Sequence, residues 1–161
     1  MIDRMDTGHD CGLQNWWDSA NHISMVIHFI CRGNTHRSRL AEAYARSSTA
    51  QIADVVVVSS GIEADRDLSG PIVPFVKRTL ENDNLLQFTG TTWTQTTQPM
   101  IEGSDVLIFM SDDVFEDAME RFQIPVERSQ RWQIPDAEGA HTQIRSAVDK
   151  LLRQLEIVGA P

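Results

Sequence analysis

A cysteine and an arginine six positions apart define the stretch of this chain that is best suited to chemistry. Cys31 directly follows an apolar run, Met25 to Ile30, that is short enough for a buried strand. Arg37 comes just before a segment whose apolar residues repeat with helical spacing from Leu40 onward. A strand, a tight loop and a helix N-terminus direct their backbone N–H groups to one spot, so this stretch predicts an anion-binding loop.

The residue types in this loop indicate phosphoryl chemistry. A thiolate is a nucleophile, and the N–H donors, the helix N-terminus and Arg37 all favour the charged form of Cys31. Arg37 also has a planar fork that matches two phosphoryl oxygens. Gly33 lets the backbone approach an anion, and Asn34 tolerates a left-handed conformation. Ser38 can donate a hydrogen bond to the sulfur, so we expect a phosphate-binding loop built around a cysteine nucleophile.

The segment Cys31-Arg32-Gly33-Asn34-Thr35-His36-Arg37-Ser38 resembles the phosphate-binding loop of the low-molecular-weight protein tyrosine phosphatase family. That family has Cys-x-Gly-Asn-x-x-Arg-Ser directly after its first strand. The resemblance implies that Cys31 and Arg37 are catalytic and that no metal or organic cofactor takes part. It implies a substrate-binding role for the rest of the loop: Arg32, Gly33, Asn34, Thr35, His36 and Ser38. The alternative is a buried, inert cysteine, which would need none of the other motif residues.

Asp136 is the candidate general acid, because phosphoryl transfer needs a proton for the leaving oxygen. The approach Trp132-Gln133-Ile134-Pro135-Asp136 is similar to the family's approach to its acidic Asp-Pro pair, although Ala137 replaces that proline. Eukaryotic members place tyrosines just after this aspartate, whereas the only tyrosine of this chain is Tyr44. As an alternative, Asp136 could cap the last helix.

Three further residues are interpreted through the resemblance. Ser59, in Ser59-Ser60-Gly61, corresponds to a serine that would support the phosphate loop near Asn34, unless it is an ordinary turn serine. His36 stands where many relatives have a second cysteine or a small residue, and Arg39 replaces a proline. We expect both to add basic groups at the mouth of the site, although Arg39 could instead belong to a solvated helix face.

Four apolar runs alternate with helical patterns along the chain. The strands are expected at 25–30, 54–58, 105–110 and 129–134, the last one weakly. Helices are expected after Arg37, from Pro71, after Ser111-Asp112-Asp113 and over about 139–157. Val73, Val76 and Leu80 mark the buried face of the second helix, and Phe115, Met119 and Phe122 that of the third. Residues 82–103 give no clear pattern.

This alternation predicts an α/β fold, a single three-layer domain with a four-stranded parallel sheet flanked by helices and the phosphate-binding loop after strand 1. Ligands bind beyond the carboxyl ends of the strands in such sheets. Cys31 follows the first strand and Asp136 follows the fourth, so both are candidates for the same crevice.

Composition limits the partners. The chain has 161 residues and a formal net charge of −9, which disfavours binding to nucleic acid and to anionic membranes. No apolar run is long enough to span a membrane. Two cysteines, Cys11 and Cys31, do not make a disulfide framework, so a cytoplasmic location is expected.

We divide the chain into an N-terminal extension, 1–22, and a domain, 23–161. Trp16-Trp17 is expected to pack on the domain or on a second copy, which makes a homodimer a candidate assembly.

These observations predict a cytoplasmic phosphatase that hydrolyses phosphate monoesters through a phosphocysteine intermediate. The expected substrate is a phosphorylated protein, most directly phosphotyrosine, or a small aryl phosphate. Two alternatives remain open. An arsenate reductase would need an external small thiol, because no cysteine follows Cys31. A phosphocysteine carrier domain would lack the arginine that Arg37 supplies.

Overall fold

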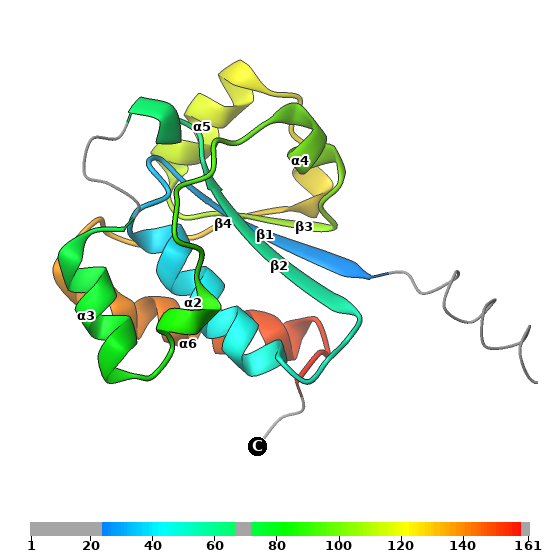
Figure 1. Cartoon of the computed structure of the whole chain (residues 1–161). Helices are drawn as coiled ribbons and strands as arrows, with labels where there is room; N and C mark the ends of the chain where they lie inside the picture. The colour runs from blue at the N-terminus through cyan, green and yellow to red at the C-terminus, as the bar shows by residue number, and fades with distance from the viewer. Residues whose placement is uncertain (1–23, 67–71, 159–161) are drawn as a thin grey trace, which may run out of the picture.

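The computed structural model describes residues 24–66 and 72–158, and its centre is one parallel sheet (Figure 1). The strands are β1 (Met25–Cys31), β2 (Val55–Gly61), β3 (Val106–Phe109) and β4 (Ser129–Arg131). Their order is β2-β1-β3-β4, and each neighbouring pair is parallel. The predicted α/β fold with a four-stranded parallel sheet is therefore confirmed. The carboxyl ends of all strands lie at one edge, as the crevice prediction requires.

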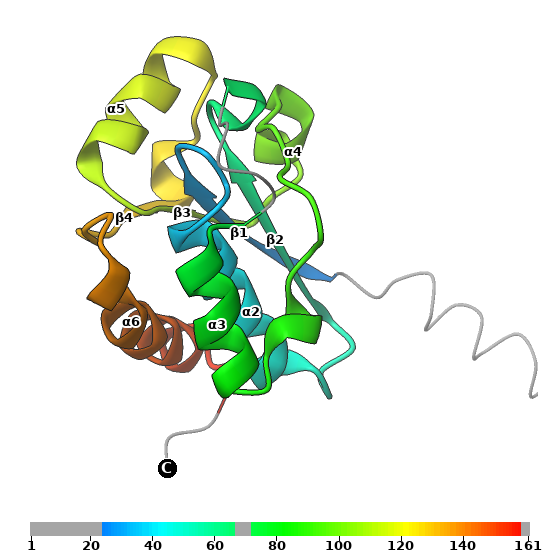
Figure 2. The same cartoon turned by 60° about the vertical axis from the view of Figure 1, so that its left-hand side comes forward.

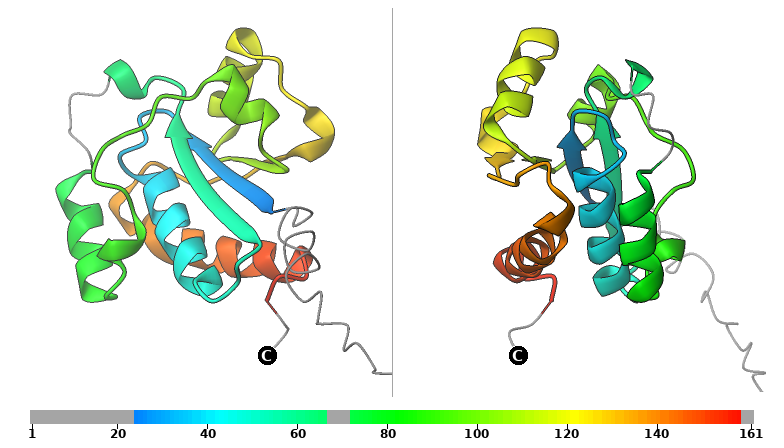
Figure 3. Two further views of the ribbon diagram at one scale, coloured as in Figure 1. Left: turned by 45° about the vertical axis from the view of Figure 1, so that its right-hand side comes forward. Right: turned by 90° about the vertical axis from the view of Figure 1, so that its left-hand side faces the viewer.

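Helices cover both faces of the sheet. On one face lie α2 (Arg37–Thr49), α3 (Pro74–Asn82) and α6 (His141–Gln154), and on the other lie α4 (Gln98–Glu102) and α5 (Asp112–Arg121) (Figures 2 and 3). Short 3-10 turns occupy parts of the connections: Ala64–Arg66, Leu86–Phe88, Val126–Arg128 and Glu138–Ala140. The predicted three layers are thus two helical layers with the sheet between them.

The two faces of β1 supply two separate apolar cores. Ile27, Phe29 and Cys31 belong to the cluster that includes residues of α2, α3 and α6. Ile30 belongs to the smaller cluster, which includes residues of α4 and α5. Because both faces are buried, the residues of the strand are apolar apart from His28, which explains why its sequence does not alternate between apolar and polar residues.

Several predicted helix details are wrong. The second helix begins at Pro74, with Val73 at its N-cap, and Pro71 lies outside the described residues. The preference of proline for the first turn of a helix still explains where α3 begins, but the proline is Pro74, the next one along the chain. In α5 the buried residues are Val114 and Ala118, whereas Met119 is 44% exposed. Phe115 and Phe122 are partly buried and pack against this core, as predicted, so the predicted stripe is wrong at Met119 alone.

The last two elements are shorter than expected. β4 ends at Arg131, although Trp132 N–H and Ile134 N–H still donate to carbonyl groups at the end of β3 and just beyond it. α6 begins at His141, so Asp136 cannot be its N-cap. The proposed extension 1–22, with Cys11 and Trp16-Trp17, lies outside the described residues. Within the described ranges, no helix is long and apolar enough to cross a membrane.

Candidate active site

The loop between β1 and α2 packs tightly against the end of β2. Glu63 N–H donates to Arg32 O at 2.8 Å. A Cβ atom on Gly61 would lie 2.5 Å from Arg32 O and 2.7 Å from Asn34 N. Both neighbours are backbone atoms that cannot rotate away, so only glycine fits at position 61 without displacing the loop.

Asn34 is the centre of the hydrogen bonds that shape this loop. Its φ angle of 57° is left-handed, which asparagine tolerates better than most residues. Its Nδ2 donates to Ser38 Oγ at 2.9 Å and to Ser59 Oγ at 3.0 Å. Its Oδ1 accepts from Thr94 N–H at 2.8 Å. The structure thus places Ser59 within reach of Asn34, and it adds Thr94 from the segment whose sequence gave no clear pattern.

Cys31 has the surroundings of a nucleophile. Its Sγ accepts from Asn34 N–H at 3.1 Å and lies 2.9 Å from Ser38 Oγ. Ser38 Oγ already accepts a hydrogen bond from Asn34 Nδ2, so its own hydrogen can be donated to the sulfur. The thiol is buried and unpaired, at the N-terminal end of α2. The sulfur is thus surrounded by two hydrogen-bond donors near a helix N-terminus, which is the setting of a nucleophilic cysteine.

Arg37 is held from the ends of two other strands. Its side chain is buried, and Nη1 donates to Ser111 Oγ and to Ile134 O, each at 3.1 Å. Ser111 is the N-cap residue of α5, although its side chain makes no capping bond and accepts from Arg37. These contacts fix the plane of the guanidinium, which is what bidentate recognition of a phosphoryl group requires.

The guanidinium of Arg32 is surrounded by carboxylates. Nη1 lies 2.7 Å from Asp117 and 3.3 Å from Glu63, and Nη2 lies 2.9 Å from Asp113. These carboxylates raise the pKa of Arg32 further and keep it ionised. Contacts with Arg121 and Arg32 lower the pKa of Glu63. The charge of Arg32 is thus paired with acids at the edge of the cavity, and its substrate-binding role stays a prediction.

His36 and Asp136 are in direct contact although 100 positions separate them. His36 Nδ1 lies 2.6 Å from Asp136 Oδ1, and Arg37 Nε lies 3.8 Å from the same oxygen. Burial lowers the pKa of His36 in spite of the opposing effect of Asp136. The lowered pKa favours the neutral imidazole near pH 7, so His36 lies in the cavity lining, as expected, but as a weaker base than a free histidine.

Arg39 does not lie at the mouth of the site. It is only 2% exposed, and its Nε donates to Asn34 O at 2.9 Å. Both expectations for this residue, a basic group at the entrance or a solvated helix face, are therefore wrong. The sequence shows that Arg39 is a charged residue on a helix, but it does not show which distant segment covers the side chain.

A cavity of about 410 Å³ lies at the carboxyl edge of the sheet. It is lined by Cys31, Arg32, Gly33, Thr35, His36, Arg37, Glu63, Val73, Phe75, Asp136 and Glu138. Cys31 and Asp136 thus share one crevice. Phe75 was not identified from the sequence; it comes from α3 and meets the His36 ring edge-on, with 4.8 Å between centroids. The one feature of the sequence that could have indicated Phe75 was its position on the predicted helix, next to the apolar residues Val76 and Leu80.

The family model for low molecular weight phosphotyrosine protein phosphatases matches residues 26–156. That match covers most of the chain, so this protein belongs to the low molecular weight phosphotyrosine protein phosphatase family. The predicted family and enzyme class are therefore confirmed. The protein is a cysteine-dependent phosphatase, and the family's reaction proceeds through a phosphocysteine intermediate.

Solved structures show the same fold. A low molecular weight protein tyrosine phosphatase from T. tengcongensis is 17% identical, with a TM-score of 0.71, and the match covers 81% of this chain and 99% of that one. The phosphatase SP-PTP from Streptococcus pyogenes is 20% identical, with a TM-score of 0.69 and coverages of 81% and 93%.

A third solved structure is that of YwlE, a Bacillus subtilis protein also described as an arginine phosphatase. A mutant with a phosphorylated active-site serine is 23% identical, with a TM-score of 0.66 and coverages of 81% and 93%. The comparison with curated proteins gave no significant match.

Proposed function

We propose that this protein removes phosphate from phosphotyrosine in proteins, with Cys31 as the nucleophile and Asp136 as the general acid. The observation that supports this most strongly is the placement of Cys31 Sγ. The sulfur lies between two hydrogen-bond donors in a cavity that also contains Arg37 and Asp136. The few cysteines of the chain make the cytoplasm the proposed location.

In this reaction Cys31 attacks phosphorus in line with the departing oxygen. The loop N–H groups and Arg37 hold the three equatorial oxygens, where charge develops in the transition state. Asp136 gives its proton to the leaving phenolate and then takes a proton from the water that attacks phosphocysteine. The products are a phenol, inorganic phosphate and the free thiolate. Ser38 Oγ, 2.9 Å from the sulfur, stabilises that thiolate when it leaves.

Phosphoarginine is a second candidate substrate. The cavity contains Glu138 and Asp136, two carboxylates with exposed side chains, and Phe75 is the one benzene ring among its described lining residues. Carboxylates at the entrance favour a substrate whose group next to the phosphate is cationic. YwlE, which shares this fold, is described as an arginine phosphatase. A tyrosine ring would instead rely on Phe75 for stacking.

Comparison of kcat/KM across a substrate panel tests the proposal. The panel contains matched peptides carrying phosphotyrosine, phosphoarginine or phosphoserine, and arsenate with a small thiol. We expect the highest kcat/KM with phosphotyrosine and no turnover by Cys31→Ser. A higher value with phosphoarginine would assign the second candidate. Arsenate-dependent thiol consumption without phosphate release would make the protein an arsenate reductase, and stable phosphocysteine without turnover would make it a carrier.

A further inference from the structure

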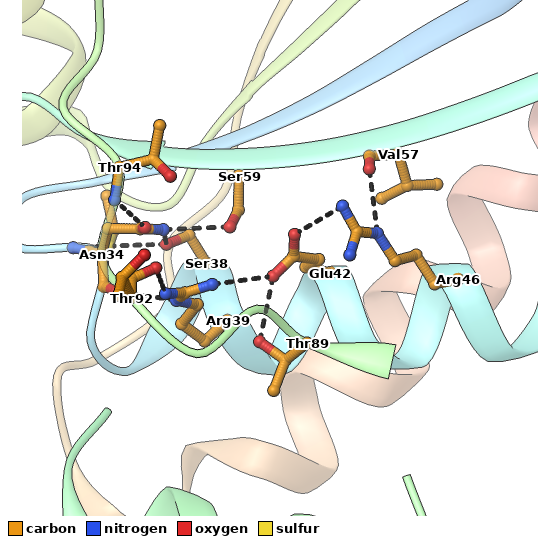
Figure 4. Close-up of polar contacts among 11 residues, drawn as sticks. Asn34, Ser38, Arg39, Glu42, Arg46, Val57, Ser59, Thr89, Thr92 and Thr94 are labelled. Carbon is orange, nitrogen blue, oxygen red and sulfur yellow. Dashed lines mark hydrogen bonds and ion pairs between the residues drawn. The ribbon is translucent and has the colours of Figure 1, made fainter. Parts of the chain in front are cut away.

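Arg39 links three segments of the fold through one buried guanidinium (Figure 4). Nε donates to Asn34 O in the phosphate loop at 2.9 Å. Nη2 donates to Thr92 O in the connection that precedes α4. Nη1 lies 3.3 Å from the carboxylate of Glu42, one turn further along α2. The three acceptors lie in different directions, which suits a planar guanidinium and not a single ammonium group.

Glu42 balances the charge of Arg39 inside the protein. Its side chain is only 4% exposed, and it also accepts from Thr89 Oγ1 at 3.0 Å and pairs with Arg46 Nη2 at 2.9 Å. Arg46 in turn donates from Nε to Val57 O in β2 at 3.0 Å. Removing one member of a buried charge network leaves the others uncompensated, which destabilises the fold. A loss of stability alone therefore cannot show what Arg39 does for the site.

Asn34 connects the guanidinium to the nucleophile. Its N–H donates to Cys31 Sγ at 3.1 Å, and its carbonyl accepts from Arg39. The residue is left-handed, with a φ of 57°, so its conformation needs support from neighbours. Arg39 also anchors the segment that reaches the side chain of Asn34, because it donates to Thr92 O, two residues before Thr94, whose N–H donates to Asn34 Oδ1. Arg39 thus contacts the backbone of Asn34 directly and one of the segments that hold its side chain.

The surroundings of Arg39 are shaped to the guanidinium. Gly90 lies where a side chain would collide, because a Cβ atom there would be 2.9 Å from Nη1. The contacts of Arg46, by contrast, are to Glu42 and Val57, and the cavity lining does not include it. The two arginines therefore share one carboxylate, but Arg39 alone of the two also contacts the phosphate loop.

We propose that Arg39 is a positioning residue for the nucleophile: it fixes the Asn34 peptide so that the N–H remains directed at Cys31 Sγ. The loop is then organised for phosphate before substrate arrives. This inference rests on the proposed role of Cys31. Arg39 does not line the cavity, but in this role it helps to hold the reacting sulfur in place.

The test compares Arg39→Met and Arg39→Lys with a matched control, Arg46→Met. Each variant is assayed for its unfolding free energy, its affinity for inorganic phosphate and the rate at which iodoacetate alkylates Cys31 across a pH series. Peptide mapping separates Cys31 from Cys11. All measurements use the full chain at a temperature where circular dichroism shows it folded.

We expect Arg39→Met to weaken phosphate binding by about tenfold and to lower kcat/KM by about 100-fold. It should also slow the alkylation of Cys31 at acidic pH. Arg39→Lys should give an intermediate loss, because an ammonium can approach Glu42 but cannot also reach both carbonyl groups. Arg46→Met should lose stability while phosphate affinity and alkylation stay within about twofold of the wild type, since its contacts do not include the loop.

The proposal is overturned if Arg39→Lys keeps the wild-type phosphate affinity and alkylation profile, and this variant decides the question should Arg39→Met fail to fold. It is also overturned if the Arg39 variants and Arg46→Met lose phosphate affinity in the same proportion to stability. Phosphate binding and alkylation do not require turnover. A wild-type protein that hydrolyses no phosphate substrate would therefore contradict the proposed function and still leave Arg39 tested.

Discussion

At the residue scale, the contact between His36 and Asp136 determines how a proton can reach the leaving group. A neutral imidazole has one nitrogen that donates and one that accepts. At a separation of 2.6 Å, His36 Nδ1 can either donate to the carboxylate or accept from the carboxylic acid. Burial keeps the pKa of His36 low, so the histidine does not hold a second proton near pH 7. A carboxylic acid at Asp136 can thus donate to Nδ1 of a neutral His36 that keeps its own hydrogen on Nε2, which is an arrangement that suits a general acid.

Asp136→Asn tests this role. We expect kcat to fall most for alkyl phosphates and other poor leaving groups, because these need the proton, and to fall less for a nitrophenyl ester. The basic limb of the kcat/KM profile should flatten as well. Asp65→Asn is the matched control, since Asp65 is exposed and does not line the cavity. An equal loss for every leaving group, or the same pattern in the control, would place the acid elsewhere.

At the residue scale, the sequence was enough to predict the roles of some residues but not the positions of others. The roles proposed for Cys31 and Arg37 could be inferred because they depend on local spacing in one loop. The contacts of His36 and the position of Arg39 could not, because each is decided by a partner remote in sequence or by the segment that covers it. His36 meets Asp136 across 100 positions, and Arg39 lies under the connection that contains Thr92.

At the element scale, the phosphate loop depends on the end of its neighbouring strand. β2 ends at Gly61, whose Cα leaves no room for a side chain beside the backbone of Arg32 and Asn34. The valine run predicted this strand, and the resemblance to a family pattern indicated a serine and a glycine at its end. The close approach of strand and loop is a tertiary feature, however, and no local periodicity reports it.

Gly61→Ala should therefore displace the loop. We expect kcat/KM to fall by about 100-fold, since a shift of about 1 Å in a positioned nucleophile has an effect of that order. Gly139→Ala is the matched control, because a Cβ atom there would meet nothing within 4 Å. Steady-state kinetics on both variants checks the claim. Unchanged kinetics in Gly61→Ala would mean that the loop is not held by this contact.

At the scale of the whole molecule, the helical layer formed by α4 and α5 is joined to the sheet partly by a buried polar chain. Ser104 Oγ donates to Met100 O at 2.7 Å, so it accepts from His28 Nδ1–H at 3.2 Å. His28 Nε2 then accepts from Ser60 Oγ–H at 2.7 Å. Each N–H or O–H group in this chain of hydrogen bonds has one acceptor. Because His28 Nδ1 donates and Nε2 accepts, the imidazole must be neutral. Burial accordingly lowers the pKa of His28 to about 4.

This burial makes the stability of the fold depend on pH. An unfolded histidine binds a proton below its ordinary pKa of about 6.5, whereas the folded protein takes up that proton only near pH 4. The contribution of neutral, buried His28 to the unfolding free energy is therefore fully present above about pH 6.5, and it is lost as the pH falls to about 4. We expect the unfolding free energy to drop by about 2 kcal/mol between about pH 7 and about pH 5 on account of this group. Urea unfolding of the wild type and of His28→Gln measures it, and equal pH dependence in both proteins would contradict it.

The overall architecture was the most predictable level. Four apolar runs separated by helical patterns are enough to predict a parallel sheet with covered faces, because burial on both sides leaves a continuous apolar strand. Helix ends were less predictable, as the start of α3 at Pro74 shows. The segment 82–103 gave no pattern because Thr92 and Thr94 contribute through hydrogen bonds to α2 and the phosphate loop, not through an apolar face.

Detection of the covalent intermediate tests the central claim most directly. Asp136→Asn is mixed with a nitrophenyl phosphate, quenched in acid within one turnover, and digested for mass spectrometry. We predict one phosphoryl group on the peptide that contains Cys31, and none on that peptide when Cys31→Ala, which has no nucleophilic side-chain atom, is treated in the same way. Nitrophenol release without a phosphorylated Cys31 peptide, or turnover that survives Cys31→Ser, would contradict nucleophilic attack by Cys31.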